Sequence, residues 1–415
     1  MNVKLLLTSF TLSVSVCSFS QESNKAFAIT GSGAGDFQWM NIRQIDLSTG
    51  AVTKNIFEKG VTNFQLRNAA TDKELVLQNQ EAKQLPSGQL PTATMVAAAA
   101  YDKRHNKLFF TPMSINELRW LDLSSDPSNR KFYTLQSVLL MPGKANDEAN
   151  HITRMTIGDD GNGYALTNDG NHLIKFTTGK KVIITDLGAL VDASENKNLS
   201  IHNRCSSWGG DIVGCASGDL YLFTAMKNVF KISLENKIAT YLGSITGLSG
   251  AYTLNGAAVD DEEKVIISSA NTFEGFYKVN IKDLVATKLN TRGPVFNASD
   301  LANGNLLFAK ESRNALGAAP LIQREVIGNQ FISIFPNPIF GSQFKVTFDN
   351  KATGDYQITL TDVQGKVLMT RNIFVKAAGQ VETINLRSKP ANGMYMIKVT
   401  NANKRSVFSD KIVIQ

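Results

Sequence analysis

The feature that most constrains the fold of this chain is an internal repeat of four short apolar segments. In each copy these segments alternate apolar and polar residues, and turn residues separate them, which predicts β-strands. The copies begin at Met95, Ile152, Gly210 and Leu254. Their first turns are expected near Asp102, Asp160, Gly218 and Asp261. Because four short strands cannot bury both faces alone, neighbouring copies must pack against one another.

The two ends of the repeat region complement each other. A fifth copy covers residues 295–310, with its turn near Asn303. We expect this copy to stop after two strands. Residues 39–57 have the form of a third and fourth strand joined at Gly50. A blade shared between the two ends closes a ring and removes exposed sheet edges. We therefore expect an all-β protein with a β-propeller, the alternative being a β assembly that does not close.

The number of four-stranded blades is expected to be five or six. Four complete copies and one shared copy make five blades. Residues 26–31 resemble an additional second strand, and segment 60–93 has room for more strands. We favour six blades on these grounds.

The N-terminus has the pattern of a signal peptide over residues 1–20. Lys4 precedes an apolar run at 5–16, and Ser18 and Ser20 fit a small-residue cleavage site. Cys17 raises lipidation as an alternative, although Val16 stands where a lipidation site prefers a small residue. The sequence has no other long apolar run, so we expect no transmembrane segment in the mature protein.

The two remaining cysteines, Cys205 and Cys215, stand ten positions apart. An exported chain meets an oxidising compartment, so we predict a disulfide between them, with two buried thiols as the alternative. The spacing of His and Cys does not suggest a metal site, and we expect no metal or cofactor.

The basic charge is confined to the C-terminal part of the chain. The formal net charge is +7, but residues 326–415 hold 11 Lys and Arg against 5 Asp and Glu. Apart from Lys4, residues 1–325 hold 31 basic and 31 acidic side chains. A nucleic-acid-binding domain normally carries a basic excess of its own, so we expect no nucleic-acid partner.

Propellers usually bind ligands at the central channel or on the loops that lead into the innermost strands. Those loops hold polar and aromatic residues that suit a sugar or an anion. The candidates are His151, Arg154, His202, Arg204, Trp208, Tyr252, Asn255, Arg292 and Asn297. Alternatively, these side chains cap strands and coat a solvated rim. Segment 159–163 weakly resembles a calcium loop, but hairpin-turn chemistry explains its composition without an ion.

The sequence contains no nucleophile, metal or phosphate-loop motif. We favour a surface or secreted binding module over an enzyme, and we expect it to be a monomer without catalytic residues. The alternatives are a hydrolase or lyase acting on extracellular polysaccharide and an adhesive part of the cell surface.

The last part of the chain reads as a separate small domain. Residues 313–330 are aperiodic and are expected to form a linker after a propeller at 21–312. Residues 331–415 contain about seven alternating strands, which predicts an immunoglobulin-like β-sandwich. Pro336 and Pro338 in "FPNPIF" fix φ and remove backbone donors, so this stretch is expected to form a sheet edge or corner.

This segment resembles the type A C-terminal sorting domain of the type IX secretion system of Bacteroidota. The resemblance rests on several motifs that occur in the family's order. The matching residues are Pro336, Asn337, Pro338, Gly354, Tyr356, Leu360, Asp362, Gly365, Lys366, Gly393, Tyr395, Ile397, Val399 and Lys411. The chain ends in Gln415, where many members end in lysine or arginine.

The resemblance implies a route of export and one partner. The signal peptide would deliver the chain to the periplasm, and the type IX machinery would read the C-terminal domain at the outer membrane. The cargo would then be released or attached at the cell surface, where its ligand is unknown.

Overall fold

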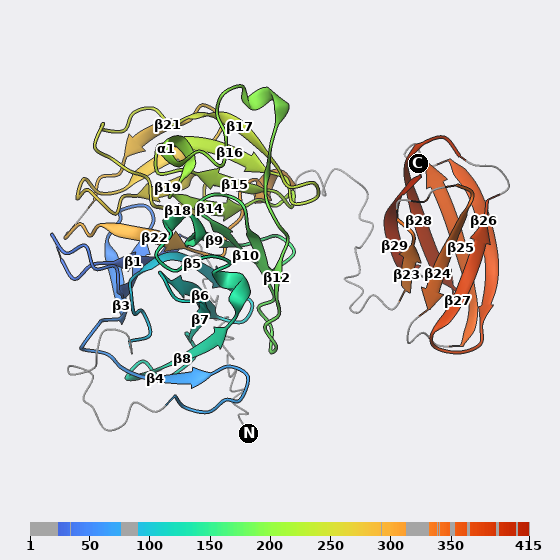
Figure 1. The fold of residues 1–415 in the computed structure, drawn as a ribbon, viewed down its shortest axis with the longest axis horizontal. Coiled ribbons are helices and arrows are strands. Elements are labelled where there is room, and N and C mark those ends of the chain that lie inside the picture. Colours follow the sequence, from blue (N-terminus) through green and yellow to red (C-terminus); the bar gives the residue numbers. More distant parts are fainter. Residues whose placement is uncertain are drawn as a thin grey trace, which may run out of the picture. The chain divides into compact units, whose positions relative to one another are not determined.

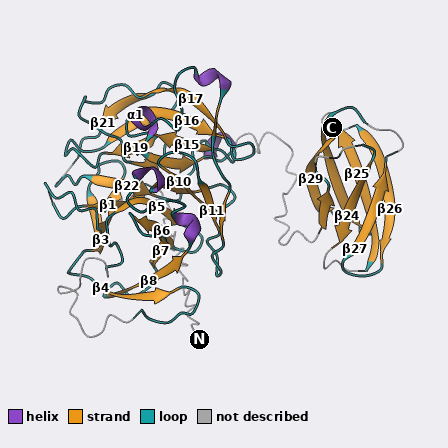
Figure 2. Ribbon diagram, in the orientation of Figure 1, coloured by secondary structure: helices purple, strands orange, loops and turns teal. Residues whose placement is uncertain are grey.

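The computed structural model describes residues 24–33, 35–75, 90–291, 293–312, 332–337, 339, 341–348, 353–362, 366–386, 390–403 and 406–414. The chain divides into two compact units, Met1–Ala319 and Pro320–Gln415. Strands are the main regular structure of both units, and the few helices are one-turn pieces (Figure 2). No helix in the described ranges is long and apolar enough to cross a membrane.

The first unit consists of five sheets, which we call blades 1 to 5 (Figure 1). From the innermost strand outward, blade 1 contains β22 (Ala298–Ala302), β1 (Lys25–Thr30), β2 (Asn41–Asp46) and β3 (Val52–Phe57). Blade 2 contains β5 (Val96–Asp102), β6 (Lys107–Pro112), β7 (Glu117–Asp122), β8 (Asn129–Gln136) and the parallel edge strand β4 (Asn63–Asn68). Blade 3 contains β9 (Ile152–Ile157), β10 (Gly163–Thr167), β11 (Leu173–Phe176) and β12 (Ile184–Asp186).

The last two blades follow the same plan. Blade 4 contains β14 (Asp211–Gly214), β15 (Leu220–Phe223), β16 (Asn228–Ile232), β17 (Ile238–Ser244) and the parallel edge strand β13 (Val191–Asp192). Blade 5 contains β18 (Gly256–Val259), β19 (Val265–Ser268), β20 (Tyr277–Asn280) and β21 (Val285–Lys288). The short helices are η3 (Val138–Leu140), η4 (Glu148–Asn150), η5 (Ser194–Asn196) and α1 (Arg204–Ser207).

The five innermost strands form a closed ring. They neighbour one another in the order β22, β5, β9, β14, β18 and back to β22. Their side chains are small where the ring is most crowded, as at 97–100 of β5 and at Ala257 and Ala258 of β18. Small side chains let five backbones approach one axis at the packing density of a protein interior.

Each pair of neighbouring blades buries its own apolar core, and this stacking holds the ring together. Phe27 of blade 1 shares a core with Phe110 and Phe132 of blade 2. On the other side of blade 1, Ala28 shares a core with Ile266 and Phe276 of blade 5. The remaining three blade interfaces hold cores of the same kind. The predicted β-propeller is therefore confirmed.

Blade 1 closes the ring as predicted, but with a different division of strands. β22 pairs with β1 in an antiparallel ladder that sets Phe27 opposite Ala302. The C-terminal end of the repeat region thus supplies one strand instead of two. Residues after Asn303 leave the sheet because Asn303 donates to the Val259 carbonyl of blade 5 at 2.7 Å and Leu307 bridges to Cys215 of blade 4.

The preference for six blades is wrong for the described residues. β1, which was expected to belong to an additional blade, is the second strand of blade 1. β4, from the segment with room for more strands, only extends the outer edge of blade 2. Residues 76–89 of that segment lie outside the described residues.

The predicted disulfide is also wrong. Cys205 lies exposed in α1, whereas Cys215 is buried, and both thiols are free. β14 runs between the two cysteines, so they lie at opposite ends of an innermost strand. The Cys215 thiol instead contacts the Ser217 hydroxyl at 3.1 Å.

The second unit contains two sheets around one core, as expected for a sandwich. One sheet has the order β23 (Ile332–Phe335), β24 (Gln343–Phe348) and β27 (Gln380–Asn385). The other has the order β26 (Val367–Val375), β25 (Gly354–Asp362), β28 (Gly393–Asn401) and β29 (Ser406–Ile414). Phe344 and Phe348 of the first sheet and Ile358 and Ile397 of the second belong to the same buried cluster.

The asparagine between the two prolines holds the last strand of the chain. The Asn337 amide donates to the Lys411 carbonyl at 3.1 Å, and its oxygen accepts from the Val413 N–H at 2.9 Å. Two residues on, the Ile339 N–H donates to the Val413 carbonyl at 2.7 Å. Because proline cannot donate to a sheet ladder, the Asn337 side chain replaces part of the backbone pairing along β29.

The other sorting-motif residues have structural positions in this unit. Tyr356 is buried against Phe348, and the Tyr395 hydroxyl donates to the Ala391 carbonyl at 2.7 Å. Asp362 and Lys366 close a hairpin, in which the Lys366 N–H donates to the Asp362 carboxylate at 2.9 Å. Gly354 and Gly393 begin β25 and β28. Pro338 and Gly365 lie outside the described residues.

Replacing Asn337 is expected to loosen β29. Asn337→Ala removes two hydrogen bonds to the strand, each worth about 0.5–1.5 kcal/mol. Amide hydrogen exchange of the full chain should show faster exchange across β29 and little change in the propeller. Asn337→Asp is the matched control, because it keeps the acceptor for Val413 and loses the donor to Lys411. Equal protection of β29 in Asn337→Ala and the unchanged chain would contradict this role.

Candidate functional site

The upper face of the propeller, where the innermost strands begin, holds a cavity of about 300 Å³ on the ring axis. Every blade contributes to its wall, through Ser299, Ala97, Thr153, Gly210 and Asn255. The remaining lining residues are Trp39, Glu148, Asn168, Arg204, Trp208, Gly209, Ala270 and Asn271. The cavity therefore lies where the sequence predicted that a propeller would bind a ligand.

One wall of the cavity combines an aromatic ring with an ion pair. The Arg204 guanidinium lies 5.2 Å from the centre of the Trp208 ring and contacts the Glu148 carboxylate at 2.9 Å. Both charged side chains are largely exposed. An exposed ion pair contributes little stability, so this arrangement is not explained by folding. It places a donor group over an aromatic ring and an acceptor group beside that donor.

The loop before β14 fixes this wall. Asn203 caps α1, its side-chain oxygen accepting from the Cys205 N–H at 2.8 Å. The Trp208 indole donates to the His202 carbonyl at 3.1 Å. A Cβ atom on Gly210 would lie 1.8 Å from the Phe223 carbonyl oxygen, and its φ is +91°. Only glycine lets the chain turn from Trp208 into β14 at this point.

Two of the predicted binding residues stabilise this loop from below. Arg154 is fully buried, and it donates to the carbonyls of Gly209 at 2.9 Å, Thr167 at 3.1 Å and Ser207. His202 contacts the carbonyls of Asp169 at 2.6 Å and Leu190 at 3.2 Å. Both residues join blades 3 and 4, and neither lines the cavity.

The remaining predicted residues are divided between the cavity and the framework. Asn255 lines the cavity, as do Arg204 and Trp208. Tyr252 is buried in blade 5, where its hydroxyl donates to the Ile267 carbonyl at 3.1 Å. His151 contacts the Ala145 carbonyl at 2.7 Å, and the buried Asn297 donates to the Ala270 carbonyl at 2.9 Å. Arg292 lies outside the described residues.

Two carboxylates that the sequence analysis missed lie inside the channel, and both are fully buried. Asp211 of β14 accepts from the N–H groups of Ala257 and Ile212, each at 2.7 Å. Neither oxygen of Asp300 of β22 has a hydrogen-bond partner among the described residues. Burial raises the pKa of Asp211, and burial together with the charge of Asp211 raises the pKa of Asp300.

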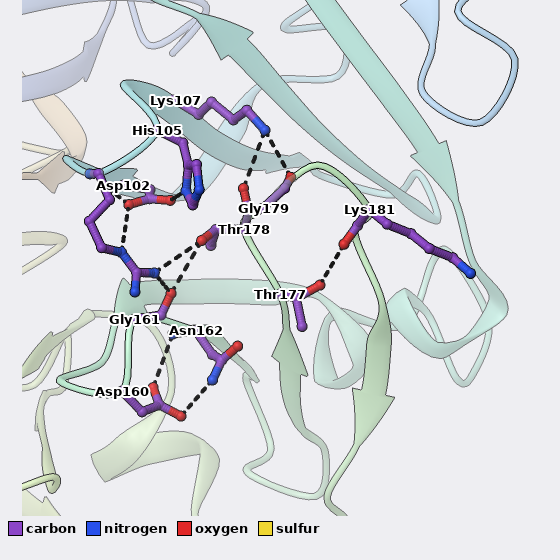
Figure 3. A network of polar contacts seen from close by, with 11 residues as sticks. Asp102, His105, Lys107, Asp160, Gly161, Asn162, Thr177, Thr178, Gly179 and Lys181 are labelled. Atoms are coloured by element: carbon purple, nitrogen blue, oxygen red, sulfur yellow. Dashed lines mark hydrogen bonds and ion pairs between the residues drawn. The ribbon is translucent and has the colours of Figure 1, made fainter. Parts of the chain in front are cut away.

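On the lower face, where the innermost strands end, turn residues connect blades 2 and 3 through hydrogen bonds (Figure 3). Asp102 contacts His105 at 2.6 Å and accepts from the Arg104 N–H at 2.9 Å. Arg104 reaches across to the Gly161 carbonyl and to the Thr178 hydroxyl of blade 3. In the segment that resembled a calcium loop, Asp160 accepts from the Asn162 N–H at 3.0 Å, as turn chemistry predicts.

A family model for the secretion system C-terminal sorting domain matches residues 333–415. This match confirms the resemblance inferred from the motifs. A domain of this kind directs its cargo through the type IX system to the cell surface or the extracellular space, so the predicted localisation is confirmed. None of the curated protein sequences matches the chain.

Several solved structures resemble this chain distantly. One is PorZ, a surface component of the type-IX secretion system of Porphyromonas gingivalis, with 11% identity and a TM-score of 0.31 over 94% of this chain and 51% of PorZ. Another is a streptogramin B lyase, with 13% identity and a TM-score of 0.36 over 71% of this chain and 90% of the lyase. A virginiamycin B lyase from Staphylococcus aureus has 11% identity and a TM-score of 0.33 over 91% of this chain and 96% of the lyase.

This chain spans about half the length of PorZ. At these TM-scores none of the likenesses carries an argument about function, so the assignment of a five-bladed propeller rests on the sheet order and the ring of innermost strands.

Proposed function

We propose that this chain, whose last domain is a type IX sorting domain, is an exported binding protein that takes a saccharide in the axial cavity. The observation that carries the proposal is the Trp208 ring beside the Arg204–Glu148 pair, in a cavity reached by all five blades. An aromatic ring suits the apolar face of a sugar, and the guanidinium and carboxylate suit its hydroxyl groups.

The proposed role is binding without chemistry. Glu148 is the one carboxylate among the described residues that line the cavity, and Arg204 already pairs with it. Asp211 and Asp300 are buried below the cavity and do not line it. General acid and base catalysis on a glycosidic bond normally needs two carboxyl groups that reach the substrate.

We also propose the predicted order of parts for the whole chain. It comprises a signal peptide at 1–20, a propeller at 21–312, a linker at 313–330 and a sorting domain at 331–415. The division into Met1–Ala319 and Pro320–Gln415 and the family match at 333–415 support this order. In this proposal the source is a member of the Bacteroidota, and the cargo keeps its signal peptide only until it reaches the periplasm.

The saccharide proposal is tested by binding of the full chain to a glycan array, followed by calorimetry with the best oligosaccharide. Trp208→Ala should raise the Kd at least about tenfold, the size of effect seen when a central aromatic contact is removed. Phe374→Ala is the matched control, since Phe374 is an exposed ring of the sorting unit, 51% accessible. An array without any bound saccharide, or equal affinities for both variants, would refute the proposal.

A further inference from the structure

A second hollow, which we call the basic groove, lies on the lower face between blades 1 and 2. Its volume is about 290 Å³. Four cationic side chains line it, Lys25 and Lys54 from blade 1 and Lys103 and Arg130 from blade 2. The described residues that line it include no aspartate or glutamate.

Strand register brings the cations of blade 1 to the face that meets blade 2. Phe27 of β1 pairs with Gln44 of β2, and Gln44 pairs with Lys54 of β3, so these three side chains share one row across the sheet. Lys25 lies two residues before Phe27, on the same face of β1.

Blade 2 supplies the opposite wall. Lys103 lies in the turn after β5, beside Tyr101, whose ring centre is 4.9 Å from that of Phe27. Arg130 of β8 crosses the interface and donates to the Ile56 carbonyl of β3 at 3.3 Å. Gly304 gives Lys103 its room, because a Cβ atom there would lie 2.9 Å from the Lys103 Cβ.

The cations of the groove lack the partners that lysines have elsewhere in the ring. Lysines on the third strands of blades 3, 4 and 5 each contact an aspartate in the neighbouring hairpin turn. These pairs are Lys175–Asp160 at 3.1 Å, Lys231–Asp219 at 2.9 Å and Lys278–Asp260 at 3.1 Å. In contrast, the amino groups of Lys25, Lys54 and Lys103 contact no carboxylate or other acceptor among the described residues.

Arg130 strengthens the positive charge of the groove. Its side chain is only 2% exposed, and its guanidinium donates to the backbone carbonyls of Ile56 and Ser125. Burial lowers the pKa of Arg130, while the charges of Asp126 and Asp122 act against this without a direct contact. A buried charge that meets only carbonyl dipoles is incompletely compensated, so an anion in the groove would relieve it.

We propose that the basic groove binds a small ligand through a doubly charged tetrahedral oxyanion, a phosphate or sulfate group. Three free ammonium groups and one guanidinium exceed what a single carboxylate can balance, and lysine serves as a point-charge partner of phosphate. The groove is large enough for one sugar-sized group attached to the oxyanion, and this group would lie beside the Phe27 and Tyr101 rings. This site is separate from the axial cavity and independent of the proposed saccharide function.

The test is calorimetry of the full chain with inorganic phosphate, glucose 6-phosphate and neutral glucose at constant ionic strength. The variant Lys25→Gln/Lys54→Gln/Lys103→Gln removes the free charges, and each loss should weaken phosphate binding about tenfold. The matched control is Lys144→Gln/Lys180→Gln/Lys181→Gln, which removes three exposed charges away from the groove. The single variant Lys54→Gln and the melting temperatures of all variants show whether a lost affinity for phosphate reflects unfolding of the propeller.

Phosphate binding that survives in the control variant and is lost in the groove variant supports the site. Tighter binding of glucose 6-phosphate than of phosphate identifies an ester as the ligand, whereas equal binding identifies free phosphate. The proposal is overturned if neither anion binds the unchanged chain, if glucose binds as well as its phosphate, or if the groove and control variants bind phosphate equally. Loss of saccharide binding in Trp208→Ala has no bearing on these outcomes, since Trp208 lies on the upper face.

Discussion

Deletion of residues 21–57 is expected to leave a chain that does not fold into a soluble propeller. The deletion removes β1, β2 and β3, so β22 loses its partner and stands alone. It also opens both cores of blade 1, exposing Phe110 and Phe132 on one side and Ile266 and Phe276 on the other. Each large apolar side chain loses about 1.5–3 kcal/mol on exposure, and the total exceeds the roughly 5–15 kcal/mol by which domains are stable.

The effect of the deletion is measured by solubility and by thermal unfolding. A circular permutant, which keeps all strands of blade 1 but changes their order along the chain, separates the loss of contacts from a change in chain order. In the permutant, residues 24–57 follow β22 through a hairpin made of Asn303 and Gly304. This chain has all four strands of blade 1 and should unfold cooperatively, while the deleted chain should aggregate. A soluble deletion variant with a sharp unfolding transition would show that blade 1 is dispensable for the ring.

The repeat could be predicted from the sequence because alternation and turn residues are local properties. They located the hairpin turns at Asp102 and Asp160. The pairing of β1 is not local. Its partner β22 lies some 270 positions away in sequence, as the contact of Ser299 with the Ile29 carbonyl illustrates, so β1 was counted toward another blade.

The direction of side chains limited the prediction of the site. Loops into the innermost strands did form the cavity, but the sequence could not tell which of their polar residues would point inward. Arg154 lies on β9, next to the buried Met155, and its guanidinium turns to the carbonyls of the next blade. The position of Arg154 within an innermost strand, and not in the loop before it, was the available signal that Arg154 belongs to the framework.

A similar signal marks the two channel carboxylates. Asp211 in "GDIVG" and Asp300 in "ASDLA" are acidic residues within otherwise apolar innermost strands. A charge at such a position needs a partner or a proton. The two residues solve this differently, since Asp211 accepts two backbone N–H groups and Asp300 accepts none among the described residues.

Replacing these two aspartates by asparagine is therefore expected to have opposite effects at neutral pH. Asp300→Asn removes a buried carboxyl group that must hold a proton to stay uncharged, and should stabilise the propeller by about 1–3 kcal/mol, while Asp211→Asn leaves a backbone N–H without an acceptor and should destabilise it by a similar amount. Thermal unfolding measures both effects, since each kcal/mol of stability shifts the melting temperature of a large domain by about 2–4 °C. Asp159→Asn, at an exposed turn position, is the matched control.

The stabilisation by Asp300→Asn should depend on pH in one direction. The folded-state pKa of Asp300 is raised, because burial and the charge of Asp211 disfavour its ionised form. Below the unfolded pKa, about 3.9, both states bind the proton and Asp300 costs nothing extra. As the pH rises above that value the unfolded chain releases the proton more readily than the folded chain, so the unsubstituted propeller loses stability until the folded pKa is passed.

The difference in melting temperature between Asp300→Asn and the unchanged chain should accordingly be small at pH 4 and larger at pH 8. A difference that stays constant, or shrinks as the pH rises, would mean that Asp300 is ionised and compensated within the channel.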